Sequence, residues 1–262
     1  MFISVVIPAY NEEAYLGDCL AALASREQGG PQNYPADGYE IIVADNNSTD
    51  RTAEIARECG ARVVPVAEKG VAHARQGGCM AAAGDTIRRQ RDTIRRQRDT
   101  IRRQRDLLAS TDADTLVSPD WLAIIAARFQ ADDGLVGLMG PVYLREGPGY
   151  ARAYQAVVMN NWFRLFRVLG RPCFPGQNFA VRRADFQAIG GIDTRMRTGE
   201  DMDLSLRLRH RGRIGWEPRM IVRTSDRRVS EGAWANLSRG LRDYLFIAIL
   251  ERGTGSDFRD IR

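Results

Sequence analysis

A chain of 262 residues can bury one sizeable hydrophobic core as a single domain, and its four cysteines, which show no C-x-x-C spacing, argue against a zinc site or a disulfide framework. Its net charge of +5 would normally favour a nucleic-acid or membrane partner. However, residues 86–106 are three copies of Thr-Ile-Arg-Arg-Gln-Arg-Asp, which contribute +6 and leave −1 for the remainder, so nucleic acid is not the expected partner.

The first predicted strand covers residues 2–7, a β-branched run that is broken by Pro8 and followed by a polar loop over 9–13. This strand starts so early that it leaves no room for a signal segment, and no apolar run reaches the ~20 residues that cross a bilayer. We therefore expect a cytoplasmic protein. A second strand over 41–44 is closed by the polar residues 45–50. Helices are predicted over 12–24, 51–58 and 69–83, and a short strand over 62–66.

The third polar cluster follows the apolar run 107–109, where Asp112 and Asp114 lie one residue apart. A buried strand that stops at acidic residues delivers charge to the carboxyl edge of an open α/β sheet, where ligands bind. Two carboxylates this close repel each other unless a cation lies between them. Hard divalent metals take oxygen ligands and share them with phosphates, so the pair predicts Mg²⁺ or Mn²⁺ with a diphosphate. For this triplet alone, a solvated turn is the competing interpretation.

The second half of the chain predicts a helix over 119–127, a glycine-punctuated strand over 135–142 and a long helix over 150–169. The last of these mixes apolar residues with arginine, which is typical of a helix on a membrane surface but equally of core packing, and we favour core packing. Residues 175–183 begin with a glycine-containing stretch that is followed by amide side chains. Residues 199–204 place acidic side chains at the start of another helix. These acids are either N-terminal caps or catalytic groups.

Four motifs in this order, Pro8-Ala9-Tyr10-Asn11-Glu12-Glu13, residues 45–50, Asp112-Ala113-Asp114 and Gly199-Glu200-Asp201, resemble those of a family 2 glycosyltransferase of the GT-A fold. They span about 190 residues. The resemblance implies one α/β domain over 1–262 with a mostly parallel sheet flanked by helices. Residues 86–106 would then be an insertion, which we expect to form a solvated, partly helical projection.

The resemblance also implies roles for individual residues. Asp201 would be the catalytic base and Glu200 would orient it or the acceptor, while Asp112 and Asp114 would hold the metal. Arg75 would contact the donor or lie on a solvated helix face. Gly176, Gln177 and Asn178 would line the acceptor side, and Arg227-Arg228 are a further candidate for covering the diphosphate. The implied donor-binding residues are Pro8, Ala9, Tyr10, Glu12, Asp45, Arg75, Asp112 and Ala113.

The expected reaction is metal-dependent transfer of a sugar from a nucleotide-diphosphate sugar to a hydroxyl acceptor, including a lipid-linked one, with peripheral membrane contact in that case. A single base acting opposite the leaving group implies inversion. The Q-x-x-R-W motif of processive synthases is absent, which favours one sugar per acceptor.

Two other functions are open. A nucleotidyltransferase also uses strand-end acids and a metal, but residues 8–13 contain no glycine, lysine or arginine to make its phosphate loop. A nucleic-acid or polyanion binding protein would act through the arginine-rich repeat. That function leaves the four ordered acidic motifs unexplained.

Overall fold

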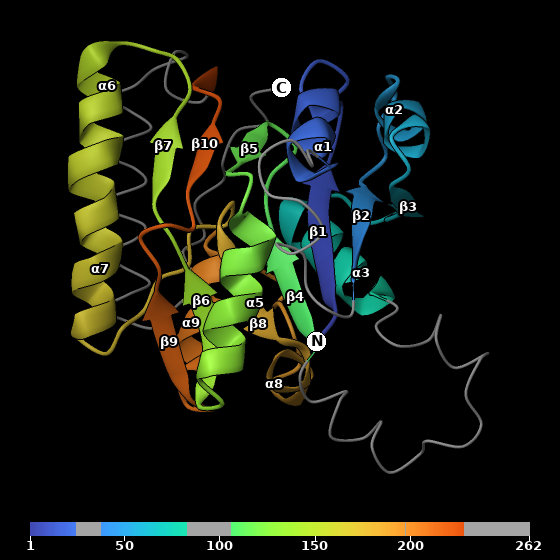
Figure 1. Cartoon of the computed structure of the whole chain (residues 1–262). Coiled ribbons are helices and arrows are strands. Elements are labelled where there is room, and N and C mark those ends of the chain that lie inside the picture. Colours follow the sequence, from blue (N-terminus) through green and yellow to red (C-terminus); the bar gives the residue numbers. More distant parts are fainter. Residues whose placement is uncertain (25–37, 83–105, 197, 228–262) are drawn as a thin grey trace, which may run out of the picture.

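The computed structural model describes residues 1–24, 38–82, 106–196 and 198–227, and these form an α/β fold around one large sheet (Figure 1). The strand order in this sheet is β3-β2-β1-β4-β8-β6-β9. Neighbouring strands are parallel except at β8, which is antiparallel to both β4 and β6. The mostly parallel α/β architecture expected from the sequence is therefore confirmed. The strands are β1 (Ile3–Ala9), β2 (Tyr39–Asp45), β3 (Arg62–Pro65), β4 (Leu107–Ser110), β6 (Leu135–Met139), β8 (Phe179–Arg182) and β9 (Arg213–Trp216).

Helices cover both faces of this sheet, which is why β1 and β4 read as continuous apolar runs. On one face, Trp121 and Phe129 are fully buried beside the odd-numbered residues of β1. On the other, Phe174 and Phe179 stack at 5.0 Å between ring centroids. The first face carries α1 (Leu16–Ala24), α2 (Thr52–Glu58) and α5 (Trp121–Ala131); the second carries α3 (Val71–Ala81), α8 (Arg183–Ala188) and α9 (Glu200–Leu208).

A second sheet of three short strands lies beyond the carboxyl end of β4. Its order is β5 (Thr115–Val117), β10 (Val222–Thr224) and β7 (Val142–Leu144). The sequence predicted one strand over 135–142, which is wrong, because the chain leaves β6 at Gly140 and starts β7 at Val142. This break allows β7 and β10 to pair in parallel, and it brings residues 224–227 beside the turn that follows β4.

The helix predicted over 150–169 is present as α6 (Gly149–Ala153), a π-helical segment η3 (Tyr154–Met159) and α7 (Asn160–Val168), which stand as one column on the flank of the molecule (Figure 1). Phe163 and Phe166 are buried, as core packing requires, whereas Val157, Val158 and Leu169 are exposed. The preferred core role is therefore wrong for the outer side of this column. Among the described helices, none is long and apolar enough to cross a membrane.

The proposed projection over 86–106 falls almost entirely outside the described residues, with Asp106 as its one described member. Asp106 is buried, and its Oδ1 accepts a hydrogen bond from the Phe2 N–H at 3.3 Å. Its carbonyl accepts another from the Arg183 N–H at 2.9 Å. The last residue of the repeat is thus part of the fold at the start of β4.

Candidate active site

Three parallel strands bring their carboxyl ends to one edge of the sheet. The predicted donor-binding residues lie at these ends or in the loops that begin there. Ala9 of β1 pairs with Asp45 of β2, and Val6 of β1 pairs with Ser110 of β4. The loops that begin at these positions are therefore neighbours, although they are up to about 100 residues apart in the chain. This is the edge at which ligands bind in open α/β sheets.

The loop after β1 and the loop after β2 are joined by backbone donors. The Glu12 N–H donates to Thr52 Oγ1 at 2.7 Å, and the Glu13 N–H donates to Asp50 Oδ2 at 3.1 Å. Asn11 has a φ of 52°, in the left-handed region that asparagine tolerates. The helix predicted over 12–24 begins later than expected, since α1 covers Leu16–Ala24.

Asp45 and the two asparagines after it shape the turn at the end of β2. The Asp45 Oδ1 accepts a hydrogen bond from the Ser48 N–H at 3.2 Å. Asn46 is buried, and its Nδ2 donates to the carbonyls of Val66 (3.0 Å) and Glu68 (2.7 Å). The sequence did not mark Asn46 as important, because nothing local indicates that its side chain reaches the loop after β3.

Arg75 of α3 is the centre of a buried charge network. Its side chain is 2% exposed, and its Nη2 lies 2.9 Å from Asp112 Oδ1 while its Nη1 lies 2.5 Å from Glu200 Oε1. Its Nε donates to Ser110 Oγ at 3.2 Å. The solvated helix face considered for Arg75 is therefore wrong. The guanidinium thus holds together carboxylates from both halves of the chain.

Asp201 is half-buried beside this network. A Cβ atom on Gly176 would lie 2.9 Å from Asp201 Oδ2 and 3.1 Å from Arg75 Nη2, so the glycine permits the close approach. Burial raises the pKa of Asp201 to about 7, Glu200 adds to the rise, and Arg75 opposes it. A carboxylate whose pKa lies near neutral is suited to general base catalysis.

Asp114 lies in the turn between β4 and β5, two residues after Asp112. Its Oδ1 accepts from Thr224 Oγ1 at 3.1 Å, and its Oδ2 accepts from Ser225 Oγ at 2.6 Å. The Nη2 of Arg227 donates to Asp114 Oδ2 at 3.1 Å and to both carboxylate oxygens of Glu12 at 2.9 Å. Burial opposes the charge of Arg227, but Glu12 and Asp114 raise its pKa. Arg227 thus brings Glu12 and Asp114 together around one cation.

The turn between β4 and β5 offers two carboxylates to a metal ion. Asp112 and Asp114 are 21% and 13% exposed, so both remain accessible. Within the part of the chain described here, no three or more histidine, cysteine or acidic side chains are arranged so that they alone could hold a metal ion. Mg²⁺ is commonly bound by one or two carboxylates with the remaining ligands from substrate phosphates and water, so the oxygen donors present fit a hard divalent cation.

On the predicted acceptor side, the structure separates Asn178 from its two neighbours. Gly176 lies against Asp201 and Gln177 is half-buried, whereas Asn178 is fully buried. The Asn178 side chain accepts from Trp121 Nε1 and donates to the carbonyls of Pro141 and Met220, at 2.9, 2.9 and 2.7 Å. These bonds to protein atoms replace the expected contact with an acceptor hydroxyl, so Asn178 has a structural role.

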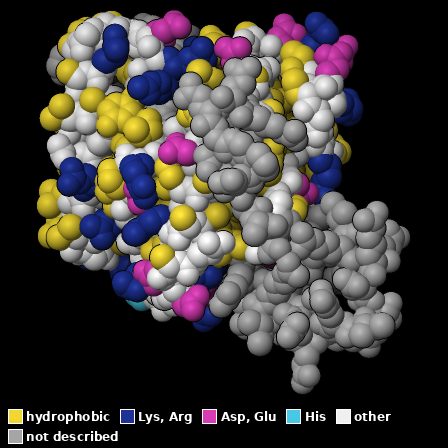
Figure 2. Space-filling model, viewed as in Figure 1, with side chains coloured by type: hydrophobic (Ala, Val, Ile, Leu, Met, Phe, Trp, Pro, Cys, Tyr) yellow, Lys and Arg dark blue, Asp and Glu magenta, His cyan; other side chains and the backbone are white. Residues whose placement is uncertain are grey.

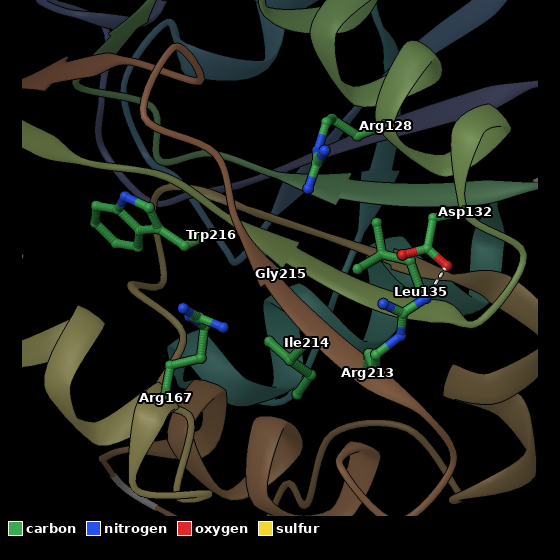
Figure 3. Close-up of a pocket in the computed structure, with 8 residues that line it drawn as sticks. All are labelled: Arg128, Asp132, Leu135, Arg167, Arg213, Ile214, Gly215 and Trp216. Atoms are coloured by element: carbon green, nitrogen blue, oxygen red, sulfur yellow. Dashed lines mark hydrogen bonds and ion pairs between the residues drawn. The ribbon is translucent and has the colours of Figure 1, made fainter.

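A cavity of about 270 Å³ lies along β9 and the start of β6, away from these carboxylates (Figure 3). Its charged lining is largely paired within the protein, since Asp132 contacts Arg213 at 2.5 Å and Arg128 contacts Glu217 at 3.3 Å. None of the predicted site residues lines it. The candidate site is therefore the strand edge and not this cavity.

A model of the family described as "Glycosyl transferase family 2" matches residues 4–190. The chain belongs to this family. An uncharacterized glycosyltransferase of Mycobacterium tuberculosis is 28% identical to it over 254 residues, which cover 95% of each chain. Glycosyltransferase AglE of Haloferax volcanii is 47% identical over 57 residues, which cover 22% of this chain and 17% of AglE. The most significant curated matches thus span under a quarter of those relatives' lengths.

Solved structures share the fold of this family 2 glycosyltransferase. Glucosyl-3-phosphoglycerate synthase from Mycobacterium tuberculosis has a TM-score of 0.62 at 19% identity, covering 97% of this chain and 82% of its own. TarS of S. aureus, residues 1–349, has a TM-score of 0.62 at 15% identity, covering 95% and 71%. At these identities the likeness establishes the GT-A type of α/β fold. It does not establish the substrates.

Proposed function

We propose that this glycosyltransferase moves one sugar from a nucleoside-diphosphate sugar to an acceptor hydroxyl and inverts the anomeric carbon. The observation that carries the proposal is the position of Asp201, a half-buried carboxyl with a pKa of about 7, beside the Arg75 that binds Asp112. One network thus connects a candidate base with a candidate diphosphate site. Supporting this, the synthase of Mycobacterium tuberculosis was solved with Mn²⁺ and UDP, and a mannosyltransferase of Pyrobaculum calidifontis with GDP-Man and Mn²⁺.

In the proposed reaction, the Asp201 carboxylate takes the proton of the acceptor hydroxyl. The acceptor oxygen then bonds to the anomeric carbon while the bond from that carbon to the diphosphate oxygen breaks, and its electron pair leaves with the diphosphate. Attack opposite to the leaving group inverts the centre. Glu200, which is 5% exposed and paired with Arg75, keeps the start of α9 in place.

Charge develops on the departing diphosphate, and the turn after β4 lies where it can be neutralised. Asp112 and Asp114 would hold Mg²⁺ or Mn²⁺, which supplies Lewis-acid stabilisation of the leaving group. Arg227 contributes a fixed positive charge beside Asp114. Pro8, Ala9, Tyr10, Glu12, Asp45 and Ala113 are proposed to line the rest of the donor site.

The acceptor is proposed to include lipid-linked molecules. Two relatives carry such acceptors in their names, one a dolichyl phosphate sugar of Methanococcus voltae and the other an undecaprenyl phosphate of Edwardsiella ictaluri. Their alignments cover 22% and 25% of this chain, so they support the class of chemistry and not a particular lipid.

A thermal-shift panel of UDP, GDP and dTDP sugars, each with and without Mn²⁺, tests this function. A donor at 100 times its Kd should stabilise the fold by about 2.7 kcal/mol, or a rise in Tm of about 5 °C. The hit is then incubated with simple acceptors, and NMR of the product reports the anomeric configuration. Absence of a metal-dependent shift with every donor, or a retained configuration, would contradict the proposal.

A further inference from the structure

The column formed by α6, η3 and α7 has one side packed and one side bare. On the packed side, Phe163 and Phe166 form a cluster with Met202 and Leu206 of α9, and Trp162 stacks on Phe166 at 4.4 Å between centroids. These contacts fix the column to the body of the protein. They also fix which side of the column faces outward.

The outward side gathers almost all of the exposed large apolar side chains. Within the described residues there are seven such side chains, of which Met80 of α3 is one and the other six lie between residues 150 and 169. Val157, Leu165 and Val168 recur at spacings of eight and three, which places them on one side of a helix, and they are 60%, 52% and 71% exposed. The remaining three are Tyr150, Val158 and Leu169.

The charge of this column has one sign. Residues 149–171 contain four arginines and no aspartate or glutamate. Arg152 and Arg164 are exposed, and Arg164 follows the same helical stripe as Val157 and Leu165. Figure 2 shows hydrophobic and basic side chains together along the left flank, where Figure 1 places α6 and α7.

We propose that this outer face, defined by Tyr150, Val157, Val158, Arg164, Leu165, Val168 and Leu169, rests on a bilayer that carries anionic lipids. Apolar side chains of an interfacial helix enter the boundary between headgroups and acyl chains, and arginines bind lipid phosphates. Residues 149–171 contribute no acidic side chain that would repel an anionic surface. The apolar side chains of this face match the acyl chains of the bilayer, and its arginines match the anionic headgroups.

A second copy of the chain is a poorer occupant of this face. A two-fold symmetric dimer would place the same patch against itself. The arginines of one column would then meet those of the other with no acid from either column between them, and this like-charge contact is unfavourable. A bilayer satisfies the apolar and the basic side chains together.

The position of the column gives the contact a consequence for the reaction. Its packed side touches α9 through Met202, which directly follows the proposed base Asp201. A membrane-resting column would therefore keep the acceptor side of the site within one helix of the bilayer. This consequence rests on the proposed function, whereas the membrane contact itself does not.

Flotation of the full-length protein with lipid vesicles tests the contact. Vesicles of phosphatidylcholine alone are compared with vesicles that also contain phosphatidylglycerol, in the absence of any donor. The wild type should float with the anionic vesicles, and Leu165→Ser combined with Val168→Ser should reduce the partition coefficient about tenfold or more. Arg164→Gln should reduce binding to the vesicles that contain phosphatidylglycerol and should not change binding to vesicles of phosphatidylcholine alone. Two control variants, Met80→Ser and Arg57→Gln, should leave the partition coefficient unchanged. They change an exposed apolar and an exposed basic side chain elsewhere on the protein.

The controls separate this face from the basic repeat at 86–106. Attraction by the repeat would be lost in high salt and insensitive to the serine substitutions. Flotation that is equal for wild type and the double serine variant would overturn the proposal, as would a wild type that does not float. Sedimentation equilibrium of the same variants covers the alternative, since a dimer abolished by the serine substitutions would assign the face to a second copy. Donor thermal shifts on these variants report the proposed function separately.

Discussion

Arg75 shares one guanidinium between Asp112 and Glu200, and the half-buried Asp201 lies close enough for this charge to oppose the rise in its pKa. Three carboxyl groups thus surround a single buried cation. Such an arrangement costs desolvation energy on every member, which the ion pairs offset as long as all partners are present. The residue-level consequence is that each member affects both the stability and the chemistry of the site.

Arg75→Gln should lower the free energy of unfolding by about 3–5 kcal/mol, because it leaves buried carboxylates without their cation. Urea denaturation followed by circular dichroism measures this. Arg57→Gln on the exposed side of α2 is the matched control and should change stability by less than about 0.5 kcal/mol. Similar small effects for the two variants would show that the network contributes little to the fold.

Asp201→Asn should lower kcat far more than it changes the Kd of the donor, because a base acts on the acceptor proton. For the wild type, the carboxylate form is needed, so log kcat/KM should rise with pH up to about 7 and level off above it. The variant should lose this dependence. Steady-state kinetics between pH 5 and 9, with donor affinity from calorimetry, provide the test, and equal losses in kcat and donor affinity would indicate donor binding instead.

Although Asp201→Asn should lower activity, the same substitution should raise the stability of the fold at high pH. The pKa of Asp201 is raised in the folded state, so its contribution to stability is present below the unfolded pKa near 4 and is lost as pH rises through about 7. At pH 8 the asparagine variant avoids a buried charge and should be more stable than the wild type by on the order of 1 kcal/mol. At pH 4 the two proteins should unfold at similar urea concentrations.

Asp114→Asn should abolish metal-dependent donor binding while the fold survives. Its carboxylate is a proposed metal ligand, and an asparagine keeps one oxygen to accept from Ser225 and Arg227, while its Nδ2 can donate to the Thr224 hydroxyl, which also accepts. Donor thermal shifts over a Mn²⁺ titration measure the effect. Asp133→Asn, at an exposed position on the loop before β6, serves as the control and should bind donor normally. Full donor binding by Asp114→Asn at low Mn²⁺ would remove Asp114 from the metal site.

At the scale of elements, α3 approaches the sheet more closely than a side chain would allow. A Cβ atom on Gly78 would lie 2.5 Å from Val6 Cγ1 and 3.2 Å from Ala44 Cβ. Gly17 in α1 has its nearest such neighbour, Ile55 Cγ2, at 4.0 Å. Both glycines lie in helices, so they differ in packing rather than in backbone propensity.

Gly78→Ala should therefore destabilise the protein by about 1–3 kcal/mol, because the clash outweighs the helical gain. Gly17→Ala should stabilise it by roughly 0.5–1 kcal/mol, since the propensity gain acts alone. Thermal unfolding of the two variants measures the contrast. A stabilising Gly78→Ala would mean that α3 can move away from β1 without cost.

The elements also show what the sequence can and cannot predict. The strands β1, β2 and β4 were predictable because each is an apolar run that ends abruptly in polar residues, and the acids of the site follow from those ends. The break between β6 and β7 was not, because it depends on pairing with β10, about 80 residues away. Likewise the amide of Asn178 reads as a ligand contact until its three protein partners are known.

At the scale of the whole molecule, the repeat joins β4 through an aspartate, and an aspartate recurs at the end of every repeat unit. Asp106 precedes β4 and binds the Phe2 N–H, and each of the three repeat units ends in aspartate. Asp85 precedes the first unit. Removing whole units therefore always leaves an aspartate directly before Leu107.

Deleting residues 86–106 should retain donor binding and cooperative unfolding, because Asp85 then takes the place of Asp106. The deletion protein should also be more acidic, since the repeat contributes +6. Adding Asp85→Ala to the deletion should cost about 1 kcal/mol through the lost bond to the Phe2 N–H. A deletion protein that folds and binds donor but cannot transfer sugar would assign the repeat to acceptor capture, contrary to this prediction.

The pairing of Arg75 with Glu200 sets an order of events during synthesis. The two residues are 125 positions apart, so at about 5–20 residues per second the ribosome needs roughly 6 to 25 s to deliver the second after the first. During this interval the guanidinium can pair with Asp112 but lacks its partner on α9. We therefore expect the charge network at the edge of the sheet to be completed only after α9 has left the ribosome.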